Sequence, residues 1–227
     1  METKRLVFES QEDWQKYRGK LFTSSEANRL MAEPTKKAKE AGQKLSDGAI
    51  TYILEKIASF YDAPKPQYYS TEMQWGNENE PAAAFELCSE LGLIVASEDV
   101  IYTSSGGMVF FCTEQYGGTP DLIFPKLKAI AEIKCPNSDT HLYYKAFLTA
   151  KNLQSELPKY YDQMQLNMHL TNSEMCYFYS FDPRLKGKLQ SHKIEIKRNQ
   201  ERIDLIIEKI ALAHELKDEI INKLNQN

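Results

Sequence analysis

The chain has 227 residues, of which 42% are hydrophobic and 26% charged, a composition typical of one globular domain large enough for a sheet covered by helices. Its formal net charge of −4 argues against a wholly basic nucleic-acid coat or a histone-like tail, although a local basic groove still fits. No apolar run approaches the roughly 20 residues that span a bilayer, and the N-terminus lacks the apolar segment of a signal peptide.

The charged residues are distributed unevenly along the chain. Residues 1–44 contain ten Lys and Arg against seven Asp and Glu, whereas residues 66–125 contain nine acids and no base. Two interpretations of the base-free span remain open: acids gathered around a cation, or chance combined with a partner surface.

The cysteines and histidines give no metal-binding pattern. The four cysteines form no CxxC pair and are expected to be buried reduced thiols, as in an intracellular protein. The four histidines are scattered, and each is interpreted as structural or exposed rather than catalytic.

The first part of the chain is predicted to be mostly helical. The sequence Thr-Ser-Ser-Glu at 23–26 forms a capping-box pattern that opens a helix. The polar, lysine-rich segment 33–44 is predicted to be an exposed loop, and 46–61 a helix with one apolar face. A second strong helix is predicted over 80–91, because Pro81 suits the first helical position.

The rest of the chain is predicted to combine strands with helices. Strands are expected at 93–96, 100–103, 108–113, 121–124, 129–134, 175–181 and 193–197, and helices at 158–170 and 199–224. The glycine pair 117–118 is expected to form a turn, and 125–128 to join two strands into a hairpin. This order predicts an α/β fold with a central mixed β-sheet flanked by helices.

The feature that carries chemistry is Thr119-Pro120-Asp121, separated by ten residues from Glu132-Ile133-Lys134, which together form the PD-(D/E)XK pattern. Antiparallel pairing would bring Asp121 and Glu132 together, and the alternation of a strand places Glu132 and Lys134 on one face. Two carboxylates suit Mg²⁺, and the backbone carbonyl of Ile133 is a further candidate ligand. A metal-activated water and a lysine that stabilises the transition state would hydrolyse a phosphodiester.

The bare pattern is weak, since a Pro-Asp turn followed by a surface Glu–Lys strand would also produce it. The segment 129–136 is otherwise apolar, so charged side chains near its end need a reason. The preceding helix offers a third acid, Glu80. The following helix offers Gln163 and Gln165, of which only one should face the site, because they are two positions apart.

Several spaced motifs occur in order between Trp14 and Arg184. They are Trp14-x-x-x-Arg18, Thr23-Ser24-Ser25-Glu26, Trp75-Gly76-Asn77-Glu78-Asn79-Glu80, Thr119-Pro120-Asp121, Glu132-Ile133-Lys134-Cys135-Pro136, Tyr161-Asp162-Gln163-Met164-Gln165 and Phe181-Asp182-Pro183-Arg184. In this order they resemble the phage lambda exonuclease-like (YqaJ-type) recombination nucleases, a PD-(D/E)XK family with the restriction-endonuclease-like fold. Ordered co-occurrence is far more specific than any one motif.

The resemblance implies a 5′-to-3′ exonuclease that degrades one strand of double-stranded DNA from an end, leaving 3′ single-stranded tails for recombination by strand annealing. It implies Mg²⁺ as cofactor, with Mn²⁺ as a substitute and two ions in the site. It also implies a ring-shaped homotrimer around the DNA and a single-strand annealing protein as partner. The expected location is the cytoplasm of a bacterial host, for a phage or prophage protein without membrane association.

The resemblance also assigns roles to residues of the catalytic pattern. Asp121 and Glu132 become metal ligands, Lys134 the catalytic lysine, and Glu80 a residue that acts on the metal or its water. Gln165 matches the active-site glutamine of the family more closely than Gln163.

A second set of residues is assigned to DNA. Arg18 and Ser25 match a pocket for the 5′-phosphate, and a helix N-terminus with a nearby arginine suits an anion on physical grounds as well. Lys36 or Lys37 could contact phosphate, with solvated lysines as the alternative. Met73 precedes the catalytic helix, as does Trp75, and both an apolar wedge against the terminal base pair and core packing remain open there.

The whole chain, 1–227, is interpreted as a single nuclease domain. Its expected parts are a helical DNA-end-binding part at 1–74, a core at about 75–197 and a C-terminal helix at 199–225. Two other functions stay open at this stage. One is an endonuclease or single-strand-specific nuclease of the same superfamily in repair or defence, and the other is a non-catalytic DNA-binding module.

Overall fold

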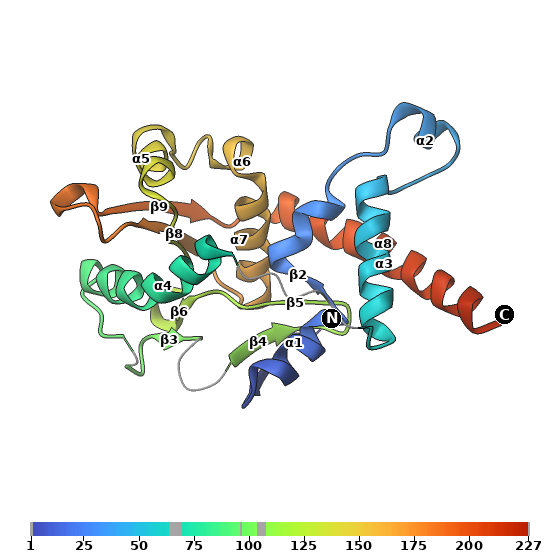
Figure 1. Cartoon of the computed structure of the whole chain (residues 1–227), viewed down its shortest axis with the longest axis horizontal. Coiled ribbons are helices and arrows are strands. Elements are labelled where there is room, and N and C mark those ends of the chain that lie inside the picture. The colour runs from blue at the N-terminus through green and yellow to red at the C-terminus, as the bar shows by residue number, and fades with distance from the viewer. Residues whose placement is uncertain (1, 64–69, 96, 104–107, 227) are drawn as a thin grey trace.

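The protein contains two mixed β-sheets with helices around them (Figure 1). The computed structural model describes residues 2–63, 70–95, 97–103 and 108–226. None of the described helices combines the length and the hydrophobicity that crossing a membrane requires.

The larger sheet has five strands in the order β3-β6-β7-β8-β9. Their bounds are β3 (Ile101–Tyr102), β6 (Leu122–Phe124), β7 (Ala129–Lys134), β8 (Met175–Phe181) and β9 (Ser191–Lys197). β7 and β8 run parallel, whereas every other neighbouring pair is antiparallel. β6 and β7 form the predicted hairpin, in which Leu122 pairs with Ala131. The predicted α/β fold with a central mixed sheet is therefore confirmed.

Helices cover both faces of this sheet. They are α4 (Thr71–Glu90) on one side and α5 (Ser138–Phe147), α6 (Leu153–Glu156) and α7 (Pro158–Leu170) on the other. Alternate residues of β7 divide between the two layers, so that Ala131 and Ile133 pack beneath α4 while Ile130 packs with α7. The C-terminal end of β7 consequently lies where the two helical layers meet.

The smaller sheet has four strands in the order β1-β4-β5-β2. Their bounds are β1 (Lys4–Phe8), β2 (Phe22–Thr23), β4 (Met108–Cys112) and β5 (Tyr116–Gly118). The predicted turn at 117–118 is wrong, because both glycines lie in β5. A Cβ on Gly117 would lie 2.5 Å from Cζ of Phe110, and a Cβ on Gly118 would collide with Asn167 and Ser24. Close packing, rather than a turn, explains the glycine pair.

The remaining helices lie in the N-terminal part and at the C-terminus. They are α1 (Gln11–Gly19), the 3-10 helix η1 (Ser24–Leu30), α2 (Lys36–Glu40), α3 (Asp47–Phe60) and α8 (Gln200–Gln226), with short 3-10 helices at Pro125–Leu127 and Gly187–Leu189. α3, α8 and η1 share one apolar core with part of α7. Figure 1 shows α3 and α8 at the end of the molecule opposite α4 and α5.

Two predictions for the N-terminal part are wrong. Thr23 occupies the N-cap position of η1, but its hydroxyl does not cap the helix and lies 3.4 Å from the Tyr52 hydroxyl instead. The predicted loop 33–44 contains α2, whose N-cap is Thr35. This part of the chain also supplies α1, β1 and β2, which are short elements without a clear apolar period.

The helix predicted from Glu80 begins at Thr71, because the Ser70 hydroxyl accepts a hydrogen bond from the Met73 N–H at 3.2 Å and so caps the helix. Pro81 therefore lies inside α4 rather than at its start. The described residues 93–95 form no strand, contrary to prediction, and Ala96 lies outside the described residues. The other predicted strands and helices agree with the structure to within two residues at each end.

Candidate active site

The β6–β7 hairpin brings the two predicted acids together. Asp121 directly precedes β6, and its backbone N–H donates to the carbonyl of Ala131 at 3.1 Å. Its side-chain Oδ2 accepts a hydrogen bond from the backbone N–H of Ile133 at 2.6 Å. This bond fixes the Asp121 carboxylate against β7, beside Glu132.

Glu132 is almost completely buried, with 1% of its surface exposed. Its Oε1 accepts hydrogen bonds from Nζ of Lys134 and from Nε2 of Gln163, each at 2.6 Å. Its Oε2 is also buried and has no hydrogen-bond partner among the described residues. Because burying a polar atom without a partner costs free energy, this oxygen is well suited to an additional ligand such as a metal ion.

Lys134 lies on the same face of β7 as Glu132, as strand alternation predicts. Its Nζ is 4.8 Å from the ring centre of Tyr160 on α7. Burial alone would lower the pKa of Lys134, but the negative charges of Glu132 and Asp121 outweigh burial and raise this pKa above its ordinary value. Beside these two carboxylates Lys134 is held protonated and can donate hydrogen bonds.

Three acids influence one another at this end of β7. Burial, followed by the charge of Glu132, raises the pKa of Asp121 well above its ordinary value, and Glu80 adds to the shift. Glu80 comes from α4, and its Oε1 accepts a hydrogen bond from the hydroxyl of Tyr102 at 3.2 Å. Carboxylates crowded in this way are typical of a functional site that holds a cation.

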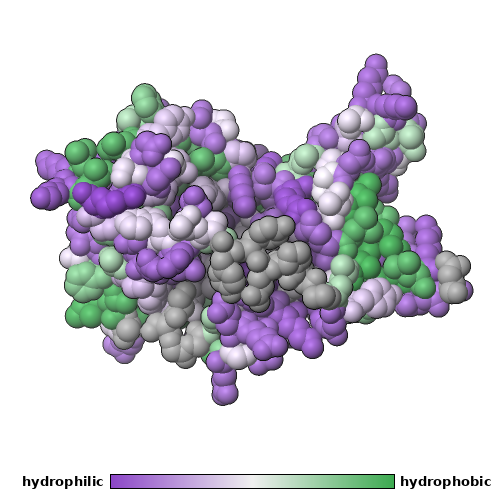
Figure 2. Space-filling model, in the orientation of Figure 1, coloured by the Kyte–Doolittle hydropathy of each residue, from purple (hydrophilic) through white to green (hydrophobic). Residues whose placement is uncertain are grey.

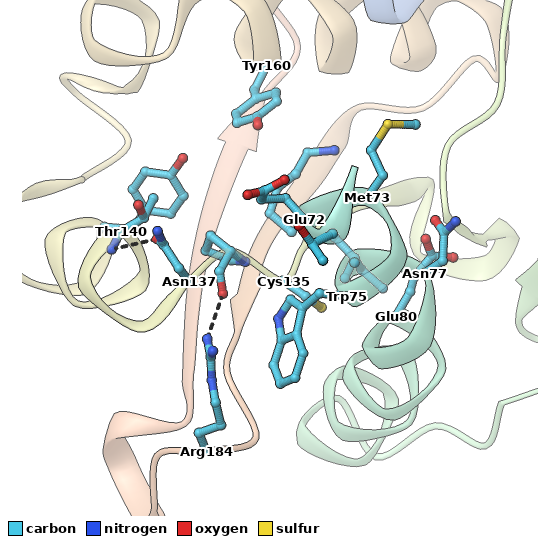
Figure 3. A pocket seen from close by; sticks show the side chains of 16 residues that line it. Glu72, Met73, Trp75, Asn77, Glu80, Cys135, Asn137, Thr140, Tyr160 and Arg184 are labelled. Atoms are coloured by element: carbon cyan, nitrogen blue, oxygen red, sulfur yellow. Dashed lines mark hydrogen bonds between the residues drawn. The ribbon is translucent and has the colours of Figure 1, made fainter. Parts of the chain in front are cut away.

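A pocket of about 780 Å³ opens at the end of β7 among α4, α5 and α7. Glu80 and Lys134 line it, together with the aromatic residues Trp75, Tyr144 and Tyr160. Figure 3 shows Glu80 on the α4 side of this pocket and Tyr160 on the opposite side. The volume lies within the range of small-molecule sites, and aromatic rings beside charged groups suit a nucleotide.

The structure places Gln163, not Gln165, against the acids. Gln165 uses both ends of its amide elsewhere: Nε2 donates to the carbonyl of Lys197 at 3.0 Å, and Oε1 accepts from the N–H of Asn199 at 2.8 Å. Residues two positions apart point to different sides of a helix, so only one of the two glutamines reaches Glu132. The structure therefore does not bring Gln165 into contact with the acids.

Arg18 and Ser25 lie together, as the 5′-phosphate prediction requires. Nη2 of Arg18 donates to Oγ of Ser25 at 3.3 Å, and the guanidinium stacks 4.5 Å from the ring centre of Trp14. Burial lowers the pKa of Arg18, and its Nε is buried without a hydrogen-bond partner in the described part of the chain. The binding of phosphate at this pair stays a prediction.

The structure does not bring the other predicted DNA-binding residues together. Lys36 and Lys37 are exposed on α2, which Figure 1 shows on a loop projecting at the end of the molecule opposite α4. Met73, in contrast, is 54% exposed on the first turn of α4 and lines the pocket. Trp75 packs against the apolar cluster beneath α4, which favours core packing for this residue.

The donor set fits Mg²⁺. The described residues contain no group of three or more His, Cys, Asp and Glu side chains that could hold a metal ion. Mg²⁺ does not need such a group, because it keeps several waters and binds through one or two carboxylates plus phosphate oxygens of the substrate. The free Oε2 of Glu132, the carboxylate of Asp121 and the carbonyl of Ile133 can supply the protein ligands.

Two tyrosines that line or support the pocket could not be predicted from the sequence. Tyr102 lies in a strand of only two residues. Tyr160 lies on α7, and the sequence pattern of this helix does not show which of its faces points toward the sheet. Arg184 lines the pocket, and only its place in a spaced motif singled it out.

The cysteines agree with expectation: all four are free and buried. Burial, aided by the charge of Glu80, raises the pKa of the Cys135 thiol to about 12, so Cys135 cannot serve as an ionised nucleophile beside Lys134.

Similar solved structures define the class of fold. An alkaline exonuclease from Laribacter hongkongensis matches with a TM-score of 0.71 and 24% identity, covering 95% of this chain and 97% of the other. Its complex with dAMP matches with a TM-score of 0.71 and 25% identity over the same shares. A phage-related exonuclease from Haemophilus somnus 129PT matches with a TM-score of 0.70 and 21% identity, covering 90% of this chain and 96% of the other. The fold is the predicted restriction-endonuclease-like fold.

The family follows from a match within the sequence. Residues 13–174 match the YqaJ-like viral recombinase domain. Because this match covers well over half of the 227 residues, the chain belongs to the YqaJ-like viral recombinase family. No curated protein matches the chain. The family indicated by the spaced motifs is thereby confirmed.

Proposed function

We propose that the chain is a Mg²⁺-dependent 5′-to-3′ exonuclease that degrades one strand of double-stranded DNA from an end. The observation that carries this proposal is the group formed by Asp121, Glu132 and Lys134, in which one buried carboxylate oxygen has no hydrogen-bond partner among the residues that the structure describes. Membership of the YqaJ-like viral recombinase family supports this activity, as does the similarity to an alkaline exonuclease and to a phage-related exonuclease. The 3′ single-stranded tails left behind would pass to a single-strand annealing protein in the cytoplasm of a bacterial host.

Each residue of the site has a role in this reaction. Asp121, Glu132 and the carbonyl of Ile133 would hold Mg²⁺, and the bound ion would lower the pKa of a water and neutralise phosphate charge. Protonated Lys134 donates to the oxygens on which negative charge develops. Gln163 keeps Oε1 of Glu132 oriented, and Glu80 faces the same pocket as an acceptor for the attacking water. The same ligands would accept Mn²⁺ and a second ion.

The pair Arg18 and Ser25 is proposed to bind the 5′-phosphate of the DNA end. An arginine that forms no ion pair with a carboxylate among the described residues, and whose Nε is buried without a partner, can form charge-assisted hydrogen bonds to phosphate. By binding the 5′-phosphate, this pair would fix the position of the DNA end so that the first phosphodiester lies in the pocket beside Lys134. The two functions, end recognition and hydrolysis, would then use different residues.

The test separates catalysis from DNA binding. We expect Asp121→Asn and Lys134→Ala to reduce Mg²⁺-dependent release of nucleotides by at least about a thousandfold, because each removes a group needed in the transition state. Both variants should still bind a 5′-phosphorylated duplex, as measured by fluorescence anisotropy. Arg18→Gln should instead weaken the binding of this duplex relative to its 5′-hydroxyl counterpart.

Full activity of both Asp121→Asn and Lys134→Ala would overturn the assignment of the site. Absence of Mg²⁺-dependent hydrolysis by the unaltered chain on every nucleic acid tested would favour a non-catalytic DNA-binding module.

A further inference from the structure

The first half of α4 contains no fully buried residue, and the partly buried Trp75 is its contact with the apolar cluster beneath the helix. The buried residues of this helix, Ala83, Ala84, Leu87 and Cys88, all follow Pro81. Pro81 has no N–H, so the carbonyl of Asn77 lacks the hydrogen bond that would normally join the two halves of the helix. Glu80 lies at this junction, and the position of its carboxylate therefore depends on what holds the preceding turns in place.

Arg184 holds these turns. Its guanidinium lies 4.2 Å from the ring centre of Trp75, a large partly buried side chain in the first half of α4. Its Nε donates to Oδ1 of Asp182 at 2.8 Å, and its Nη2 donates to Oδ2 of Asp182 at 3.1 Å. Asp182 is itself fully buried and also accepts from the hydroxyl of Ser138 at 2.6 Å. The guanidinium plane under Trp75 is thus fixed by a buried carboxylate.

The same guanidinium also contacts the end of the catalytic strand. Nη2 of Arg184 donates to the carbonyl of Pro136 at 3.2 Å, two residues after Lys134. Figure 3 shows Arg184 beside Trp75 at one side of the pocket, with a hydrogen bond that runs back toward the segment after β7. One side chain therefore joins α4, which carries Glu80, to β7, which carries Lys134.

We propose that Arg184 is a positioning residue that sets the place of Glu80 relative to Lys134, by clamping Trp75 of α4 against the segment that follows β7. This inference rests on the proposed function of the site. Lysine could not replace arginine here, because only a planar guanidinium can stack on an indole while it donates to a carboxylate and to a carbonyl. Three of its five N–H groups are used in these bonds, and they fix the guanidinium against Trp75.

The experiment compares Arg184→Lys with Arg29→Lys. Arg29 is a matched control, since it also makes a paired contact to a carboxylate, Glu55, at 2.7 and 2.8 Å, and stacks on an aromatic ring, that of Tyr52, at 4.5 Å, but it does not line the pocket. One readout does not depend on enzyme activity. The substitution Trp14→Phe leaves Trp75 as the only tryptophan of the chain, so the fluorescence emission of Trp75 reports whether Arg184 is stacked on it. The second readout is the dependence of kcat and KM on Mg²⁺ concentration.

We expect Arg184→Lys to shift Trp75 emission to longer wavelength and to increase its quenching by acrylamide, with no change from Arg29→Lys. We also expect kcat to fall and the half-saturating Mg²⁺ concentration to rise, each on the order of tenfold, with KM for duplex DNA changed less than about twofold. The double variant Trp75→Leu, Arg184→Lys should have a kcat no lower than that of the poorer single variant, because the two residues act as one unit.

Two results would overturn the proposal. One is unchanged Trp75 emission with kcat reduced less than about twofold. The other is a rise in KM and a weaker salt dependence with unchanged kcat, which would make Arg184 a phosphate contact. If the unaltered chain hydrolyses no DNA, the proposed function fails, while the emission of Trp75 still decides whether the clamp exists.

Discussion

Asp121 carries its negative charge at a cost to folding. Its pKa is raised by burial and by the charge of Glu132, so the folded protein binds a proton at this position more readily than the unfolded chain. Above the raised pKa the carboxylate is charged and opposes folding. Below the ordinary pKa, near 3.9, both states are neutral and the opposition disappears. A metal ion at this position would remove the penalty at neutral pH.

Removing the charge of Asp121 should therefore stabilise the folded protein when no metal is bound. In EDTA at pH 8, Asp121→Asn should raise the thermal midpoint, by about 2–4 °C for each kcal/mol gained, since Asn can still accept the Ile133 N–H bond. The gain should shrink as the pH falls toward 4. Adding Mg²⁺ should raise the midpoint of the unaltered chain but not that of the variant. Differential scanning fluorimetry measures both, and an equal Mg²⁺ response of the two proteins would contradict the metal assignment.

The catalytic pattern itself could be predicted from the sequence at the scale of residues. Asp121, Glu132 and Lys134 are separated by fixed numbers of residues within one hairpin, and strand alternation then determines which side chains share a face. Tyr102 could not be found in this way, because its contact with Glu80 joins a two-residue strand to a helix 22 residues earlier in the sequence. Such contacts depend on packing that no local pattern encodes.

The rotation of α7 decides which glutamine reaches the site. Apolar and polar residues alternate without a clean stripe along this helix, and nearly every side chain is buried on some side. The sequence therefore defines the bounds of α7 but not which of its faces meets β7. The structure shows that Gln163 contacts Glu132, while Gln165 connects the end of β9 to the start of α8.

The second prediction tests this rotation. Gln163→Ala should lower kcat by about tenfold to a hundredfold with little loss of stability, because it frees Oε1 of Glu132 from one of its two bonds. Gln165→Ala should instead lower the free energy of unfolding by about 1–3 kcal/mol, because it truncates a buried side chain and removes its two hydrogen bonds to the partly buried backbone of Lys197 and Asn199. It should leave kcat within a factor of about two. Equal losses of kcat in the two variants would contradict the placement.

At the same scale, long elements were easier to predict than short ones. The length or the apolar pattern of an element is enough to predict its bounds in four cases, α7, α8, β7 and β8. α4 was predicted too short because Pro81 resembles a helix start, whereas the cap at Ser70 provides the actual one. The glycines of β5 resemble a turn in sequence, although they are required by Asn167, Ser24 and Phe110 packed against that strand.

At the scale of the whole molecule, the net charge of −4 is compatible with a DNA enzyme. Three of the nine acids in the base-free span, Glu72, Glu80 and Asp121, lie at the pocket or at the hairpin beside it. Others serve structure: Glu90, for example, accepts hydrogen bonds from Tyr179 and Ser191. The cation interpretation of this span can therefore apply only to part of it. The affinity for DNA would have to come from another feature, such as encirclement of the duplex.

The third prediction concerns assembly. Figure 2 shows apolar surface at both ends of the molecule, over α3 at one end and over the region of α4 and α5 at the other. The exposed residues include Leu54 and Phe60 at the first end and Phe85, Ile94 and Phe147 at the second. Two different apolar patches at opposite ends suit a head-to-tail ring, in which one patch covers the other. We propose the homotrimer that the family resemblance implies.

Light scattering should give a mass near three chains of 26.2 kDa each. Leu54→Glu on the exposed face of α3 should reduce that mass to one chain, while Lys36→Glu on the projecting α2 serves as the charge-changing surface control. A single-chain mass for the unaltered protein at micromolar concentration would contradict the ring.

The central claim is that the chain hydrolyses DNA from an end. The most direct test incubates the purified chain with Mg²⁺ and three duplexes of one sequence: linear with 5′-phosphates, linear with 5′-hydroxyls, and covalently closed circular. The phosphorylated linear duplex should lose nucleotides from its 5′ ends and leave single strands. The 5′-hydroxyl duplex should react more slowly, and the circle should stay intact. Cleavage of the circle at the rate of the linear DNA, or loss of nucleotides from the 3′ ends, would contradict the claim.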